Sequence, residues 1–233
     1  MVKIDTVYQT VLALANKEQR GYITPQEFNL FAAQAQMSIF EQYFYDLNQF
    51  LRLPGNNTSH SDMVDLLEEK ISLFEQTNAV VGNGSQLPVN LYKLQNVQWK
   101  DVLKNIKYNA EYVDSKTWQQ MRGVSLVKPT DKNLIYTRNA HGISVVGEDG
   151  KSSDVTCDYI KAPSNPNWTY VVVDQKALYN PNAVDHHDFE LHHSEQTELV
   201  TRILGLAGIT LKDQSLYQIS SNEESKQIQQ QKR

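Results

Sequence analysis

The chain has 233 residues, of which 40% are hydrophobic and 21% are charged, and its net charge is −5. A chain of this length can bury one core, or a core with an inserted subdomain. The acidic balance argues against a free-standing nucleic-acid binder, and no apolar run approaches the roughly 20 residues of a membrane span. We expect no signal peptide. The single cysteine, Cys157, excludes an intrachain disulfide framework and favours synthesis in a reducing compartment.

The N-terminal part of the sequence predicts a short helix over 4–15 and a long helix over 24–51. Thr24 is a favourable N-cap, Pro25 follows at the first helical position, and Glu27 completes a capping box. Behind the cap, apolar residues at helical spacing predict the buried face: Phe28, Phe31, Ala32, Ala35, Ile39, Tyr43, Leu47 and Phe50.

The remaining positions of the long helix are rich in uncharged amides, as a surface that faces sister subunits would be. We therefore expect subunit contacts from this helix. The predicted interface residues are Phe31, Gln34, Met37 and Phe44, together with Ile228 in the C-terminal tail.

A third helix is expected from Ser61 to Gln76, after which the composition shifts toward β-branched and aromatic residues. Strands are predicted at 91–99, 134–140, 141–147, 153–163 and 167–174, with the second and third as a hairpin and the last one buried. Short helices are predicted around 99–106 and 113–121. A polar loop at 180–188 leads to a last helix, capped by Ser194 and closed by Gly208.

Helices at both ends with strands between them indicate an α+β fold. We expect a helical bundle built from the N- and C-terminal segments, an inserted β-rich subdomain and an extended C-terminal tail. The predicted domains are an N-terminal helical part at 1–78, the β-rich insertion at 79–188, a bundle-completing helix at 189–219, and a polar tail at 220–233 that docks on a partner.

A calcium loop is the first possible metal site. Residues 16–27 align with the twelve-residue EF-hand loop, with Gly21 at the sixth position and Glu27 at the last. However, Arg20 stands where an oxygen ligand should meet the metal, and Glu18 is too long for its position. Glu27 is already explained by the capping box. We therefore expect no calcium site and no bound cofactor.

Four histidines form the second possible metal site: His186, His187, His192 and His193. Imidazoles are good zinc ligands, but neighbouring side chains of an extended strand point to opposite faces, and Cys157 is the only cysteine. A solvated loop or an intersubunit contact is favoured over a metal site, and a pH-sensitive interface stays open. The sequence also lacks nucleotide-binding and nucleophile-elbow motifs, so we expect no enzyme activity.

Three stretches resemble virion structural proteins of tailed phages, especially short-tailed phages of the crAss-like kind. VYQTVLALANKEQRGYITPQEFNLFAAQAQMSIFEQYFYDLNQF, at residues 7–50, is similar to the start of such proteins. CDYIKAPSNPNWTYV and the following DFELHHSEQTELVTRILGLAGI resemble the later part of the same proteins. The resemblance rests on the combined order and length of these stretches, since none of them is a catalytic motif.

The resemblance implies a head-to-tail connector of the adaptor or gatekeeper type. Such proteins form a neck ring, usually of twelve copies, below the portal, and combine a helical bundle, a β-domain and a C-terminal extension. The implied partners are other copies of the chain, the portal protein and an adjacent tail or ring protein, with DNA passing without sequence-specific binding. The implied location is the virion, after synthesis in the host cytoplasm. The alternatives are a tail-hub or capsid-associated protein and, from another class, a metal-dependent regulator or enzyme that uses the 186–193 histidines.

Overall fold

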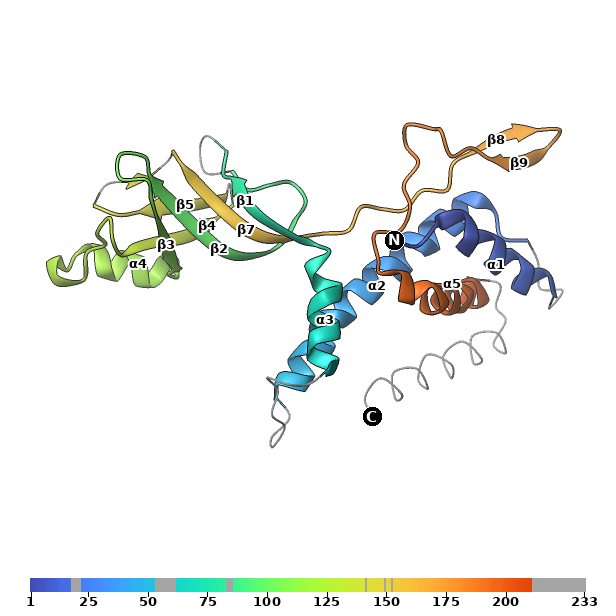
Figure 1. The fold of residues 1–233 in the computed structure, drawn as a ribbon, viewed down its shortest axis with the longest axis horizontal. Coiled ribbons are helices and arrows are strands. Elements are labelled where there is room, and N and C mark those ends of the chain that lie inside the picture. Colours follow the sequence, from blue (N-terminus) through green and yellow to red (C-terminus); the bar gives the residue numbers. More distant parts are fainter. Residues whose placement is uncertain are drawn as a thin grey trace. The chain divides into compact units, whose positions relative to one another are not determined.

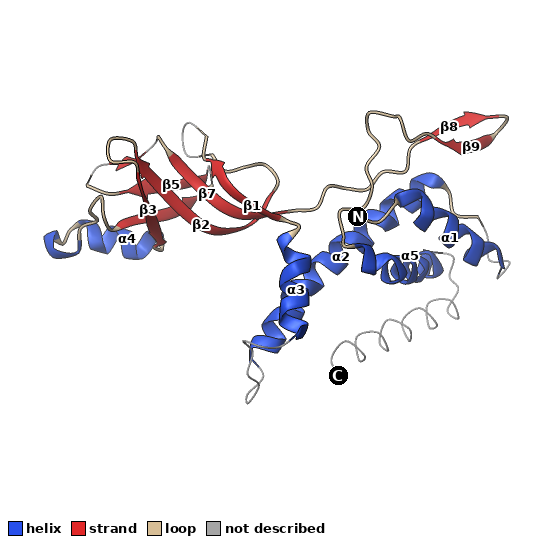
Figure 2. Ribbon diagram, viewed as in Figure 1, coloured by secondary structure: helices blue, strands red, loops and turns tan. Residues whose placement is uncertain are grey.

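A computed structural model describes residues 1–17, 22–52, 62–82, 86–140, 142–148, 150–151 and 153–210. These residues form an α+β structure, as predicted (Figures 1 and 2). The chain divides into two compact units, one of Met1–Leu73 with Pro163–Arg233 and one of Phe74–Ala162. The β-rich unit therefore begins and ends earlier than the predicted 79–188. The predicted tail at 220–233 lies outside the described residues.

The first unit, here called the helical unit, contains helices α1 (Ile4–Lys17), α2 (Pro25–Arg52), α3 (Asp62–Ser72) and α5 (Gln196–Thr210). Helix α5 packs on α1 and α2, and α3 packs on α2. The predicted capping box is confirmed, because the Thr24 N–H donates to Glu27 Oε2 at 3.0 Å and the Glu27 N–H donates to Thr24 Oγ1 at 3.3 Å. Among the helices that the structure describes, none has both the length and the apolar character needed to cross a membrane.

The buried face of α2 differs from the predicted one in its polar residues. Gln36 is only 1% exposed, and Asp46 is also buried, whereas Phe31, Leu47 and Phe50 are half-buried. The Gln36 amide donates to the Ser164 carbonyl at 2.7 Å and accepts from the Glu190 N–H at 3.0 Å. Part of the amide content of α2 thus binds segments of the same chain. The expectation that these amides face sister subunits is wrong for Gln36.

Asn29 makes the same kind of contact two turns earlier on α2. Its Nδ2 donates to Asn167 Oδ1 at 2.8 Å and to the Trp168 carbonyl at 3.2 Å, and its Oδ1 accepts from the Trp168 N–H at 2.8 Å. Residues seven apart lie on one helix face. Asn29 and Gln36 therefore hold the extended segment 164–168 along one side of α2. This attachment explains why residues after Ala162 belong to the helical unit.

The second unit, here called the β-rich unit, is a seven-stranded sheet in the order β1-β7-β2-β3-β4-β5-β6. Its strands are β1 (Glu75–Val80), β2 (Leu91–Asp101), β3 (Ile106–Tyr112), β4 (Leu134–Asn139), β5 (Gly142–Val146), β6 (Gly150–Lys151) and β7 (Val155–Lys161). Among the strands of this sheet that the structure describes, only β3 and β4 pair in parallel, and the chain between them carries the short helix α4 (Ser115–Arg122) and the 3₁₀ turn η2 (Ser125–Val127). The other neighbouring strands are antiparallel.

The four strand predictions in this unit are confirmed, and the first of them, 91–99, lies within β2. Residues 134–139 pair with 142–146 as the expected hairpin, and Gly142 has the positive φ of 142° that its turn requires. In β7, Val155, Cys157 and Tyr159 are buried in the same core cluster, as their alternation predicts. The sheet core also includes Val97, Leu94, Leu134, Ile143 and Val145.

Two boundaries in the same region were predicted wrongly. The segment 99–106, expected as a helix, forms the end of β2, a turn and the start of β3. The Asp101 carboxylate accepts from the N–H groups of Leu103 and Lys104 at 3.0 and 3.2 Å, which stabilises the turn in place of a helix. The third helix ends at Ser72, so Glu75 and Gln76 belong to β1.

Burial of Cys157 gives a testable property of the sheet core. Its side chain is 1% exposed, and burial raises the pKa of its thiol to about 11. Because the thiolate is the reactive form, we expect almost no alkylation by iodoacetamide at pH 8 in the folded protein, and complete alkylation in 6 M guanidinium chloride. Intact-mass measurement over time checks this. Alkylation of the folded chain at the rate of a small free thiol would contradict the buried placement.

Candidate functional site

The strongest candidate for a functional site is an exposed β-hairpin of the helical unit. It consists of β8 (Tyr170–Val173) and β9 (Lys176–Tyr179), paired antiparallel without any register shift (Figure 1). The turn residues Asp174 and Gln175 both have positive φ, at 47° and 61°, which identifies a type I′ turn. The prediction of one buried strand over 167–174 is therefore wrong: the chain reverses at Asp174.

The hairpin presents apolar side chains to solvent. Val172 is 64% exposed and Leu178 52%, and Val171 and Val173 are also exposed. Val171, Val173 and Leu178 lie on one face of the hairpin and Val172 on the other, because neighbouring side chains of a strand alternate. Exposed apolar side chains that are grouped in this way are typical of contact surfaces. This surface, Val171–Val173 with Leu178, is called the hairpin patch below.

The base of the hairpin rests on an aromatic cluster around Trp168. The Trp168 side chain is 2% exposed, and its Nε1–H donates to Asp5 Oδ1 of α1 at 3.0 Å. Its ring centroid lies 4.3 Å from that of Tyr8, 5.8 Å from Tyr170 and 5.6 Å from Tyr179. Trp168 thus connects both strands of the hairpin to α1, and it fixes where the hairpin emerges.

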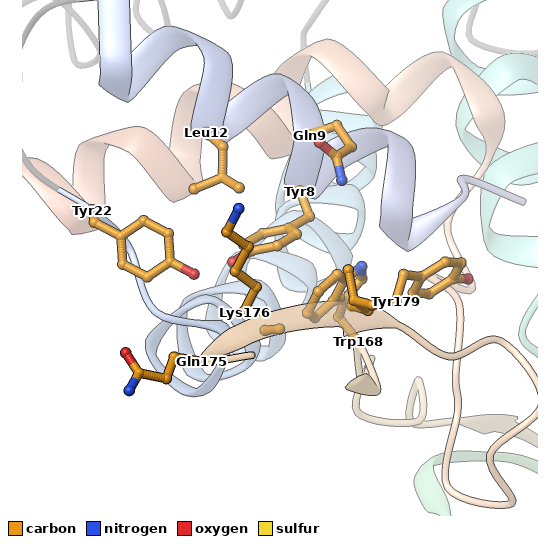
Figure 3. A pocket seen from close by; sticks show the side chains of 10 residues that line it. Tyr8, Gln9, Leu12, Tyr22, Trp168, Gln175, Lys176 and Tyr179 are labelled. Atoms are coloured by element: carbon orange, nitrogen blue, oxygen red, sulfur yellow. The ribbon is translucent and has the colours of Figure 1, made fainter. Parts of the chain in front are cut away.

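A pocket of about 470 Å³ lies between α1 and the hairpin (Figure 3). Its α1 side is formed by Tyr8, Gln9 and Leu12, its other side by the residues of β9 with Gln175, and Tyr22 and Trp168 complete it. Figure 3 shows the Lys176 side chain extending from β9 toward α1. Burial and the neighbouring Tyr22 raise the pKa of the Tyr8 hydroxyl, so this wall stays neutral. The pocket is therefore aromatic and uncharged except for the Lys176 ammonium.

Asp188 and His186 fix the chain that returns from the hairpin. The Asp188 carboxylate accepts from the Ile4 N–H at 2.9 Å, at the start of α1, and from Lys3 Nζ at 3.1 Å. His186 Nε2 lies 3.3 Å from the Tyr179 hydroxyl, and its Nδ1 lies 3.3 Å from the Asn167 carbonyl. Asp188 thus caps α1 although it is 184 residues away along the chain.

Replacement of Asp188 by alanine tests this capping role. We expect the free energy of unfolding to fall by about 1–2 kcal/mol, the usual cost of removing a carboxylate or hydroxyl cap. Lys3→Ala removes only the exposed end of the Lys3–Asp188 ion pair and should change stability by less than about 0.5 kcal/mol. Urea unfolding followed by circular dichroism at 222 nm compares the two. Equal effects of both variants would show that the ion pair, and not the cap, carries the interaction.

The other three predicted histidines also have local contacts. His187 pairs through its backbone with Asn167, and His192 caps the 3₁₀ turn η3 (His193–Glu195) by accepting from the Ser194 N–H at 3.3 Å. The rings of His192 and His193 meet edge to face at 5.8 Å. Ser194 itself, predicted as the cap, is the middle residue of η3, and α5 continues past Gly208 to Thr210. Within the described residues, no group of three or more His, Cys, Asp or Glu side chains could hold a metal ion.

The predicted interface residues on α2 lie partly at the surface of the single chain. Gln34 is exposed, whereas Phe31, Met37 and Phe44 are half-buried, and Phe44 contacts Phe40 edge to face at 5.1 Å. Ile228 lies outside the described residues, as do residues 18–21 of the calcium-like loop. Glu27 of that loop is engaged by the cap, because the Thr24 N–H lowers the pKa of its carboxyl group. A subunit contact through α2 stays a prediction.

A buried charge network is the second feature of the helical unit. Lys70 Nζ of α3 lies 2.6 Å from Glu195 Oε1, and Arg202 Nη2 lies 2.6 Å from Glu198 Oε1 within α5. Arg202 also donates to Ser38 and Gln42 of α2. Burial raises the pKa of the Glu198 carboxyl group, an effect that the Arg202 charge opposes. Each of these charged side chains has a partner of opposite charge, so the network stabilises the packing of the helices. None of the four side chains is placed as a solvent-accessible general acid or base.

The geometry therefore favours a contact surface at the hairpin over a catalytic centre. The sequence predicted a strand over 167–174 but not the hairpin that this segment forms with β9. The reason is that Asp-Gln is a weaker hairpin-turn signal than Asn-Gly or Asp-Gly. The alternation in YVVVDQKALY around a central polar pair was the available signal. Comparison of the sequence with protein-family models gives no match, and comparison with curated proteins gives none either.

Proposed function

We propose that this protein is a non-enzymatic structural protein that self-associates into a closed ring. The observation that carries the proposal is the hairpin patch, which lies beside the aromatic pocket at α1. A soluble monomer that kept four apolar side chains on an open two-stranded sheet would be prone to aggregate. A second copy that covers the patch removes this liability, and head-to-tail contacts between copies close into rings.

We further propose that the ring belongs to the neck of a tailed-phage virion, between portal and tail. The support is the resemblance of residues 7–50, 157–171 and 188–209 to virion proteins of crAss-like phages. A ring of twelve copies is the expected assembly, with a helical bundle closed by the two terminal segments. The net charge of −5 supports a channel that DNA crosses, because a channel wall should not bind phosphates. In this account residues 220–233 dock on the adjacent tail or ring protein.

Immunogold labelling of intact phage particles tests the location. Antibodies raised against the purified chain should label one site, at the junction of capsid and tail. Labelling over the capsid surface would indicate a capsid-associated protein, and labelling at the far end of the tail would indicate a tail protein. Either result would contradict the neck assignment while leaving self-association to be tested on the purified protein.

A further inference from the structure

We infer that the ring forms by strand addition: β8 of one copy enters the pocket between α1 and β9 of the next copy and pairs with β9. The inference rests on the self-association proposed above and names the elements that carry it. Its occupant is a second copy of this chain, and the contributing residues are Val171–Val173.

The hairpin has two open edges with defined hydrogen-bonding groups. Val173 and Lys176 flank a two-residue turn, and the Asn180 N–H donates to the Thr169 carbonyl at 2.9 Å. Hydrogen-bonded pairs alternate along an antiparallel ladder, so the pairs 173/176 and 171/178 bond within the hairpin. The N–H and C=O groups of Val172 therefore point outward from β8, and those of Ala177 point outward from β9. Ala177 and Leu178 lie on opposite faces of β9 and both line the pocket, whereas no residue of β8 does, so the open edge of β9 borders the pocket.

The edges of the large sheet are protected in a way that the hairpin edges are not. Strand β1 carries a register shift between Gln76 and Ala79, with Asn78 at a positive φ of 55°. Strand β6, at the other end of the sheet, has only two residues. Bulges and short strands are the usual means of preventing edge-to-edge pairing. The four-residue strands of the hairpin pair without a register shift, so no bulge prevents pairing at their edges.

The charges at the turn favour pairing of β8 of one copy with β9 of the next over pairing of the β8 strands of two copies. Asp174 and Lys176 are the only charged residues of the hairpin, and among the described residues neither has an ion-pair partner. When hairpins of neighbouring copies lie side by side in the same direction, Lys176 comes next to Asp174 of the second copy. In a two-fold β8–β8 contact the turns lie at opposite ends and the charges stay apart. The same-direction arrangement also repeats around a ring.

The pocket supplies the apolar surface that a valine strand needs. Its walls include Tyr8, Leu12 and Tyr22, of which Tyr22 is exposed. A strand in the pocket would form backbone hydrogen bonds with Ala177 and pack its side chains on Leu12 and Tyr22, which is the general mode of recognition by strand addition. It would cover Tyr22 and Leu178 in one copy and Val171–Val173 in the other.

Proline substitutions at the outward positions test the inference. Val172→Pro removes the outward N–H of β8, and Ala177→Pro removes that of β9, whereas the hairpin's own hydrogen bonds stay possible. Each variant alone should assemble at least tenfold more weakly than the wild type. A 1:1 mixture should form a heterodimer, because the Val172→Pro chain keeps its pocket and the Ala177→Pro chain keeps its β8 edge. Val172→Thr, which keeps the N–H and the β-branch, should assemble like the wild type.

Mass photometry of the separate and mixed proteins gives the readout, and near-UV circular dichroism checks that each variant is folded. Assembly of either proline variant at wild-type strength would overturn strand addition while leaving the ring proposal intact. Dimerisation of Ala177→Pro alone, with no new species in the mixture, would replace it with a two-fold β8–β8 contact. A variant that unfolds is replaced by the matching N-methylated residue, made by semisynthesis, which removes the same N–H. A wild-type chain that stays monomeric would refute both the inference and the proposed ring.

Discussion

Replacement of Trp168 by alanine is expected to lower the free energy of unfolding of the helical unit by about 3–5 kcal/mol, the usual cost of truncating a buried tryptophan. The indole is 2% exposed, contacts Tyr8, Tyr170 and Tyr179, and donates to Asp5. Removal of the indole leaves a cavity, and the Asp5 carboxylate loses the hydrogen bond that it accepts from Trp168. The hairpin should lose its fixed position on α1, so self-association should be lost together with stability.

The two remaining tryptophans make this experiment selective. Trp99 and Trp118 lie in the β-rich unit, on β2 and α4, so in the Trp168→Ala chain tryptophan fluorescence reports that unit alone. Circular dichroism at 222 nm reports mainly the helical unit. We expect the urea midpoint of the dichroism to fall strongly. Trp118→Ala is the matched control, because α4 contains no buried residue, and it should leave that midpoint unchanged. A Trp168→Ala midpoint equal to the wild type would contradict the central role of the aromatic cluster.

The second large effect is expected from Lys70→Met, which should destabilise the helical unit by about 3–5 kcal/mol. The Lys70 ammonium is the 2.6 Å partner of Glu195, whose side chain is 4% exposed, and it also lies 5.5 Å from the centre of the Tyr43 ring. Removing one member of a buried ion pair leaves the other charge uncompensated. The Ser194 hydroxyl, at 3.1 Å from Glu195, remains as a neutral donor and cannot replace the charge.

A double-mutant cycle separates the lost pair from lost packing. The double variant Lys70→Met with Glu195→Leu removes both charges, and it should recover a large part of the stability, because a buried ion pair and an apolar pair of similar size are often nearly equivalent. Lys104→Met is the control, because the Lys104 side chain is 66% exposed in its ion pair with Asp101, and it should have little effect. A double variant that is less stable than both single variants would show that the two effects add, so that lost packing, and not an uncompensated charge, causes the destabilisation.

The helices were the most predictable part of the fold because their signals are local. The Thr24–Pro25–Glu27 capping box lies within four residues and is found as predicted. The hairpin at 134–146 and the inward face of β7 also follow from short-range alternation. By contrast, the parallel pairing of β3 with β4 joins strands that a helix separates in sequence, and no local pattern encodes it.

The candidate site was less predictable because its contacts join distant segments. Asp188 caps α1 across 184 residues, and Gln36 binds two backbone groups more than 120 residues away. Periodicity placed Gln36 on the polar side of α2, since periodicity carries no information on which amide meets a buried backbone segment. The three valines at 171–173 suggested a buried strand because a valine run is common in cores. Their exposure follows from the turn at Asp174 and Gln175, which periodicity does not detect.

The exposed hairpin also changes how the predicted subunit contacts are ranked. The sequence pointed to α2, where Phe31, Met37 and Phe44 are half-buried in the single chain. The hairpin offers four exposed apolar side chains together with an open hydrogen-bonding edge, which a helix does not have. Strand addition can therefore define the order of copies around a ring, and α2 can add lateral packing once the copies are aligned.

The mass of the purified wild-type protein in solution tests the central claim most directly. Native mass spectrometry over a range of concentrations should show one closed oligomer, at an integer multiple of 26.7 kDa, in equilibrium with the monomer. A closed ring predicts that intermediate sizes are sparsely populated, because each open form leaves one β8 edge and one pocket unfilled. A chain that remains monomeric at 100 µM, or an unlimited ladder of sizes, would contradict the account.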